Sequence, residues 1–236
     1  MAGKFLHGAL VQFMDTFLIP LPNVIIFQFN PETITHTWSP AQAAGGSGPT
    51  ANPLAVKGTP GESFSFSLAM DSNDMIADGS PVAEGIAVVS GVYTRLAALE
   101  MLLYPTASPT DGLLGAVSVS AAGIGGSAAA GGVKRDVPAA QLPTVLFVWG
   151  PGRILPVKVT GLAITERLYD PLLLNPIHAE AQIGLQVLTP EELKYVTGPL
   201  ADLANVAYTY SQGLRQVLAI ANLANSVESV IGMLPV

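Results

Sequence analysis

The sequence contains no cysteine in its 236 residues, and it is also poor in charge. Without cysteine the chain can form no disulfide, no zinc–thiolate site and no thiol nucleophile. Charged residues make up 11% of the sequence, against about a quarter in typical globular domains, and half of the residues are hydrophobic. Composition leaves two explanations open: part of the surface is buried against other subunits, or glycine and alanine dilute the charge.

Positive charge is especially scarce. The net charge is −7, and no basic cluster is larger than Lys134-Arg135. Nucleic acids and anionic membranes are recognised by basic faces, so we expect neither as a partner. No uncharged run reaches the ~18–20 residues of a membrane span, so we expect no membrane insertion. The apolar stretch from Phe5 to Ile26 is interpreted as strands rather than a signal peptide, because Asp15 and two prolines interrupt it.

Residues that could hold a metal are few and scattered. His7, His36 and His178 share no spacing that would place two of them on one helical turn or one strand face. The acidic group that starts at Asp71 has Met75 where a calcium loop needs an oxygen ligand. We therefore expect Asp71 to end a strand, the later aspartates to lie in a solvated turn, and the chain to hold no metal.

Catalytic motifs are equally weak. Residues 123–128 match a dinucleotide-binding fingerprint in letters, but they lie in a low-complexity region without the strand and helix that the motif requires. Glu166 and Glu180 fall on neighbouring expected strands and could face each other, although Arg167 and a solvated sheet face explain them equally well. The sequence therefore predicts no enzyme activity and no cofactor.

Hydrophobic patterning predicts a mainly β chain. β-branched and aromatic runs, or strict alternation of apolar and polar residues, predict antiparallel strands at 24–29, 63–68, 144–149, 157–164 and 179–187. The last three are expected to form a meander. An amphipathic pattern capped by Ser80-Pro81 and ended by Pro105 predicts one helix that flanks the sheet. Residues 39–61 and 106–141, rich in glycine, alanine, serine and proline, predict loops, the second a flexible insertion.

The C-terminal segment has a different texture. After Gly198-Pro199, apolar residues recur with a seven-residue rhythm that predicts a helical extension over 196–236, separate from a β domain over 1–195. One helix of roughly 50 Å and two shorter helices folded back on the sheet are both compatible with this rhythm. The residues expected to contact other subunits are Leu203, Tyr210, Leu214, Val217 and Ala221.

Four segments in order resemble the tube-like baseplate proteins of contractile injection systems. They cover roughly residues 6 to 192. The second segment is an alternating strand, and an expected helix lies between the second and third segments. The segments are His7 through Phe27-Gln28-Phe29-Asn30-Pro31-Glu32, Phe64 to Asp71, Leu142 to Gly150, and Tyr169 to Ala179. The chain departs from the family pattern at His178, where arginine is usual, and at Asn175, where glycine is usual. The peptidoglycan-binding (LysM) domain that many relatives carry is replaced by the helical extension.

The resemblance implies a tail-tube-like antiparallel β-barrel or sandwich with one flanking helix and a C-terminal helical tail. It implies a structural subunit, a tube initiator or spike adaptor, that forms a six-fold ring with itself. Its further partners would be the inner tube protein, the trimeric spike protein, and baseplate wedge or sheath-proximal proteins. The expected location is a phage-tail-like particle assembled in the bacterial cytoplasm, with the released, extracellular particle as the alternative.

A second function class remains open from the residues themselves. A monomeric β-sandwich that binds carbohydrate or another surface ligand would need an exposed aromatic platform. The two tryptophans are Trp38 and Trp149, and Trp149 lies in an expected strand. An enzyme would need a pocket with at least two convergent polar groups, which no spacing in the sequence predicts.

Overall fold

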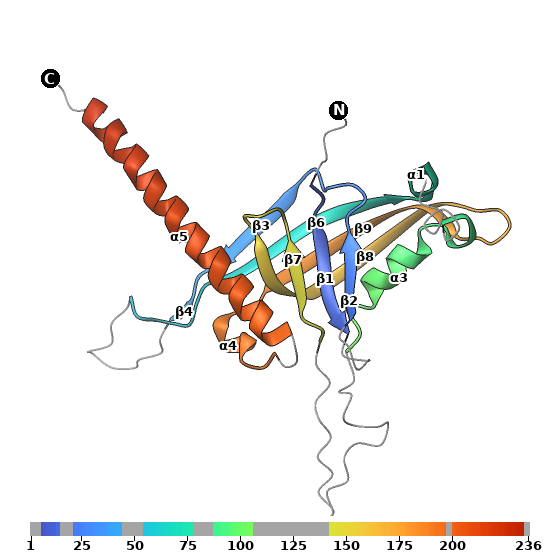
Figure 1. Cartoon of the computed structure of the whole chain (residues 1–236), viewed down its shortest axis with the longest axis horizontal. Helices are drawn as coiled ribbons and strands as arrows, with labels where there is room; N and C mark the ends of the chain where they lie inside the picture. Colours follow the sequence, from blue (N-terminus) through green and yellow to red (C-terminus); the bar gives the residue numbers. More distant parts are fainter. Residues whose placement is uncertain are drawn as a thin grey trace, which may run out of the picture.

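The computed structural model of the chain describes residues 6–14, 21–43, 54–77, 87–105, 142–196 and 200–233 (Figure 1). The expected insertion at 106–141 and the expected helix start at Ser80-Pro81 lie outside the described residues. The described part is mainly β, with helices at its periphery, so the predicted α+β class is confirmed at that level.

Seven strands form one antiparallel sheet in the order β2-β1-β7-β8-β9-β6-β3. The small strands β4 (Gln42–Ala43) and β5 (Val56–Lys57) pair with each other apart from it. The strands of the main sheet are β1 (Ala9–Met14), β2 (Leu21–Ile26), β3 (Ile34–Ser39), β6 (Gly61–Asp71), β7 (Val145–Val148), β8 (Ile154–Tyr169) and β9 (Pro176–Val187). The predicted C-terminal meander is confirmed, since β7, β8 and β9 are adjacent and antiparallel.

The sheet must curl because residues 27–33 join its two edge strands, β2 and β3. A flat sheet of this order would hold those edges about 29 Å apart, roughly the reach of the connection when fully extended. The connection is bent instead: Gly8 N–H donates to Asn30 Oδ1 at 2.9 Å, and Asn30 Nδ2 donates to the Leu6 carbonyl at 2.8 Å. Gln28 exchanges two hydrogen bonds with the backbone of Asp71, which ties the connection to the end of β6.

Aromatic contacts across the interior show the same curl. The ring of Phe147 on β7 lies 5.4 Å from Phe64 and 5.6 Å from Phe66, both on β6, although β8 and β9 separate these strands within the sheet. Phe27, just beyond β2, lies 5.6 Å from Phe66. The apolar faces of distant strands therefore meet in one shared core.

Strand patterning was predictable where apolar and polar residues alternate. Along β6 every second side chain from Glu62 to Met70 is buried, which confirms the alternation expected at 63–68.

The register between β8 and β9 corrects one expectation about two glutamates. Glu166 pairs with Ala179, whereas Glu180 pairs with Thr165, so the two glutamates lie on opposite faces of the sheet and cannot act together.

The flanking helix is shorter than predicted. Ser72–Ala77 form the short helix α1, not the solvated turn expected after Asp71, and Tyr93–Glu100 form α3. The helical residues 87–90 are separated from α3 by Gly91, which has a φ of +57°. One continuous helix up to Pro105 is therefore wrong. α3 still packs its apolar side into the core through Leu96 and Leu99, as a flanking helix should.

Gly91 offers a test of this break. A Cβ at this position would overlap the Pro176 carbonyl oxygen, which already accepts a hydrogen bond from Val92 N–H at 2.9 Å. We expect Gly91→Ala to lower the free energy of unfolding by about 2–3 kcal/mol through backbone strain and this clash. The matched control is Gly150→Ala, because Gly150 also has positive φ but open space around it, and about 1 kcal/mol is expected. Urea denaturation of both variants measures the difference, and equal losses would contradict the close approach.

Two helices follow the sheet. α4 (Pro190–Leu193) is a single turn that starts at the N-cap Thr189, and α5 (Leu200–Met233) is one continuous helix of 34 residues. The alternative of two folded-back helices is therefore excluded. The first half of α5 crosses the rim of the sheet, and its second half extends away from the sheet, so that the end of α5 lies far from the strands (Figure 1).

Candidate interaction surface

The first half of α5 is held on the sheet by a stripe of small side chains. Ala204, Ala207 and Ser211 are buried, at the spacing of one helical face. Ala207 packs against Leu146 on the outer face of β7, and Ala204 belongs to a cluster around α4. Small residues allow the helix axis to approach the strands closely, so this stripe fixes the rotation of α5 about its axis.

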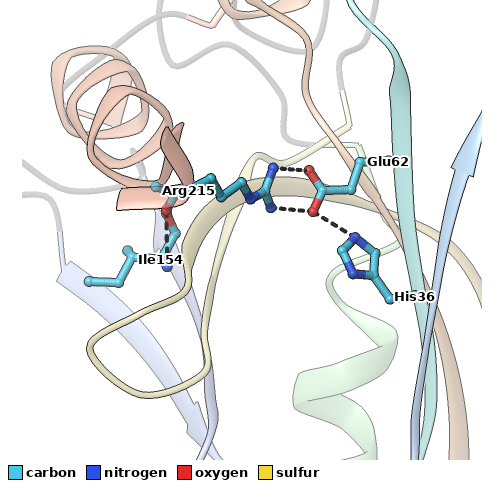
Figure 2. Close-up of polar contacts among 5 residues, drawn as sticks. His36, Glu62, Ile154 and Arg215 are labelled. Carbon is cyan, nitrogen blue, oxygen red and sulfur yellow. Dashed lines mark hydrogen bonds and ion pairs between the residues drawn. The ribbon is translucent and has the colours of Figure 1, made fainter. Parts of the chain in front are cut away.

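Polar contacts reinforce the attachment at the β7–β8 turn. Ser211 Oγ donates to the Ile154 carbonyl at 2.8 Å and accepts from the Ile154 N–H at 3.4 Å (Figure 2). The adjacent residue, Tyr210, donates its Oη hydrogen to the Pro151 carbonyl at 2.9 Å. These bonds satisfy backbone groups of the turn and of the start of β8, and they fix the position of α5 along β8.

The strongest anchor is an ion pair between α5 and the start of β6 (Figure 2). Arg215 binds Glu62 through both guanidinium nitrogens, with Nη1 donating to Oε2 at 2.8 Å and Nη2 donating to Oε1. The Glu62 side chain is only 3% exposed. Bidentate, charge-assisted bonds of this kind are strong and directional. A buried carboxylate on the apolar face of β6 therefore requires the helix to stay in place.

Two aromatic side chains surround the ion pair. His36 stacks on Phe64 with ring centroids 4.3 Å apart, and its Nε2 lies 2.9 Å from Glu62 Oε1. That nitrogen is buried and has no hydrogen-bond partner among the described residues. The Arg215 guanidinium also lies 5.0 Å from the centroid of the Trp38 ring, a cation–π distance. Together these contacts hold α5 against the sheet at Arg215.

Beyond Arg215 the helix loses these contacts. Every residue from Gln216 to Leu223 is exposed. Val217 is 61% exposed and Ile220 is 68% exposed, and Leu218 between them is also exposed. The sequence has no charged residue from 216 to 227. A helix with apolar residues on all sides is usually buried, so this half of α5 is the best candidate for a surface that binds other protein.

The predicted contact residues are divided between the two sides of α5. Leu203, Tyr210, Val217 and Ala221 are exposed, whereas Leu214 is partly buried next to the β7–β8 turn near Gly152. Their role in subunit contacts stays a prediction. What the sequence reasoning missed is the anchor, because Glu62 and Arg215 are 153 residues apart and share no local motif.

α4 gives a second attachment and a pH-dependent prediction. Partial burial raises the pKa of the Glu192 carboxyl, but hydrogen bonds from Lys158 and Thr189 and the charge of Lys158 outweigh burial, so the pKa is lower than usual. Lys158 Nζ donates to Glu192 Oε1 at 2.8 Å. A lowered pKa in the folded state stabilises the fold above the unfolded-state value near 4.3 and loses this effect as pH falls through the folded-state value.

We therefore expect Glu192→Gln to cost about 0.5–1 kcal/mol at pH 7, the range of a solvent-screened pair. The cost should shrink as the pH is lowered from about 5 to 3. Urea unfolding midpoints across that range measure it. The control is Glu191→Gln at the exposed neighbouring position, and a cost for Glu192→Gln that does not change with pH would contradict the prediction.

Two clefts lie at the surface of the described part of the chain. One of about 350 Å³ lies between α5 and the start of β6, with Trp38, Glu62, Gln212 and Gln216 in its wall. The other, of about 660 Å³, lies on the outer face of the sheet below the β2–β3 connection. In the described ranges no group of three or more metal-ligating side chains comes together. His36 and His178 face separate carboxylates, Glu62 and Asp71, at different ends of β6.

Two comparisons of the sequence with known proteins were negative. A scan against models of protein families finds no match, and a search of curated proteins finds no significant sequence match. Within the ranges that the structure describes, no helix combines the length and hydropathy needed to cross a bilayer.

Proposed function

We propose that this chain is a structural, non-enzymatic subunit of a contractile injection system baseplate. It forms a six-fold ring that links the trimeric spike to the inner tube and serves as a platform for tube assembly. One observation about α5 supports the proposal most directly. Its first half is bound to the sheet by a buried ion pair, while its second half extends outward with exposed apolar side chains. Such a helix is suited to contacts with other subunits.

The sheet edges support the same proposal. β2 and β3 are the edge strands, and Val24 and Ile26 on β2 are exposed apolar side chains. Exposed apolar edges invite pairing with another chain, and a ring in which each subunit completes its neighbour's edge removes this liability. The curled sheet with α3 at its side is compatible with a barrel of the tail-tube type, which we propose as the finer fold.

The proposed neighbours follow from this position in the particle. Besides six copies of itself, the ring would contact the inner tube protein on one side and the spike on the other. Baseplate wedge or sheath-proximal proteins would lie at its outer surface. The particle would be assembled in the bacterial cytoplasm and, in the alternative, act after release from the cell.

Light scattering on the purified chain tests the ring, first alone and then with candidate tube and spike proteins of the same system. The expected result is six times the chain mass of 24.4 kDa, either alone or once a neighbour is added. A 24.4 kDa monomer that binds neither neighbour would reject the proposal.

One observation favours a monomeric binding module as the second candidate. Trp38 is 48% exposed and lines the cleft beside α5 together with two glutamines, groups that could stack on a sugar ring and bond its hydroxyls. Tryptophan fluorescence titrated with a panel of oligosaccharides would reveal such binding. The matched control is Trp38→Phe, which should remove the response, and no response in the parent chain would exclude this candidate.

A further inference from the structure

We propose that α5 binds α5 helices of other copies of this chain, through an exposed apolar seam that lies beside the side of the helix that holds the sheet. The seam consists of Leu203, Val206, Tyr210, Gly213, Val217 and Ile220. This inference deepens the proposed ring, because it names an element through which copies touch. It relies on that ring only for the number of copies.

The spacing of the seam is that of a coiled coil. Steps of three and four residues alternate from Leu203 to Ile220, and in the sequence the same spacing continues at Ala224, Val227 and Ile231. A sustained period of 3.5 residues keeps one stripe facing a partner helix when the helices supercoil. A helix that only has to pack on its own sheet needs no such repeat.

The seam is distinct from the side of α5 that holds the sheet. With 3.6 residues per turn, the seam lies about a third of a turn from the stripe of Ala204, Ala207 and Ser211. Its members outside Gly213 are large and exposed, and Tyr210 keeps its hydroxyl on the Pro151 carbonyl at the border between the two sides. A second helix can therefore approach the seam while α5 remains anchored.

Charge favours identical helices as the occupants. Charges beside a coiled-coil seam usually select the partner, by attraction to an opposite set or repulsion from a like set. From Leu203 to Ile220 the helix has one charged residue, Arg215, and Glu62 already binds it. Nothing along this stretch repels an identical helix, and nothing attracts a charged partner of another kind.

The residue types at the seam favour more than two helices. Val206 and Ile220 are β-branched and fall at the heptad positions that follow a step of three, where β-branching shifts the preference from dimers to trimers and tetramers. Leu218, exposed outside the seam, gives the second half of α5 another apolar side for a further neighbour. Several copies that converge through α5 satisfy both features.

Cysteine cross-linking gives a direct test, because the chain has no cysteine of its own. Ile220→Cys in the full chain should form a disulfide-linked dimer under mild oxidation, since only adjacent seams bring two such residues within the ~4.4–6.8 Å between Cα atoms that a disulfide needs. The matched control is Asn222→Cys, exposed on the same half of α5 but outside the seam. At least about five times more dimer is expected from Ile220→Cys than from the control.

A charge in the seam gives the complementary test. Ile220→Asp should shift the mass measured by sedimentation velocity from an oligomer toward 24.4 kDa, whereas Asn222→Asp, which adds the same charge outside the seam, should leave the oligomer intact. Unfolding midpoints should stay unchanged in dilute samples of both variants, because position 220 does not contact the sheet.

The outcomes separate this inference from the ring. An oligomer that survives Ile220→Asp, with no excess cross-link from Ile220→Cys, would overturn the α5 seam and leave the ring standing. A cross-link to a tube or spike protein instead of a second copy would also overturn it. A monomer under every condition, alone and with neighbours, would overturn both.

Discussion

Replacement of Arg215 by alanine is expected to lower the free energy of unfolding by about 3–5 kcal/mol, a large share of the stability of an ordinary domain. The variant leaves the Glu62 carboxylate buried without its bidentate partner, and the remaining contact with His36 lacks hydrogen-bond geometry. Desolvation of an uncompensated charge is the source of the cost. Urea denaturation, followed by circular dichroism, measures it.

A matched arginine provides the control. Arg167 lies 3.7 Å from Glu180, but both side chains are largely exposed, so Arg167→Ala should cost less than about 1 kcal/mol. The double variant Glu62→Gln/Arg215→Gln should recover part of the loss, because no unpaired charge remains in the interior. Equal costs for Arg215→Ala and Arg167→Ala would show that the Glu62 pair is solvated and does not anchor α5.

The second large effect is expected at the centre of the core. Phe147 is completely buried; its ring contacts Phe64 and Phe66 from across the curled sheet, and Trp149 just beyond its own strand. Phe147→Ala should cost about 3–5 kcal/mol through the lost burial and the cavity that remains. The same urea titration measures this loss.

The control for Phe147 is another phenylalanine at the surface. Phe29 is 41% exposed on the β2–β3 connection, so Phe29→Ala should cost about 1 kcal/mol. If the sheet were flat, Phe147 would meet only its neighbours on β1 and β8. A loss for Phe147→Ala no greater than that for Phe29→Ala would then be expected, and would contradict the curl.

These two positions perform different tasks for the proposed function. The Phe147 cluster fills the interior of the curled sheet, and the Arg215–Glu62 pair attaches α5 to the rim of that sheet. The exposed half of α5 then has a fixed direction relative to the strands. An interaction element held in one direction loses less conformational freedom when it binds than a free tail would.

Much of the local structure was readable from the sequence. The alternation from Phe64 to Leu68 predicted a two-faced strand, and β6 contains it with the apolar side chains inward. The seven-residue rhythm after Gly198-Pro199 predicted helix, and α5 covers it. Both patterns depend on residues a few positions apart, whose relative placement is set by the backbone period alone.

The sequence was a poorer guide where contacts between distant segments determine the local structure. It predicted one flanking helix up to Pro105, but the approach of the Pro176 carbonyl to Gly91 breaks that helix before α3. It allowed Glu166 and Glu180 to face each other, but the register of β8 and β9 separates them. It also left open which side of α5 meets the sheet, since apolar residues lie on both sides.

The sequence by itself therefore determined the strands with clear alternation or β-branched runs, the helical character of the C-terminal segment and the scarcity of charge. Only the tertiary structure decided that the sheet curls, that Glu62 meets Arg215 across 153 residues, and that Val217 and Ile220 remain in water. The physical reason is that periodicity is a short-range property of the chain. Burial of a charge or exposure of an apolar side chain depends on which remote segments fill the space around it.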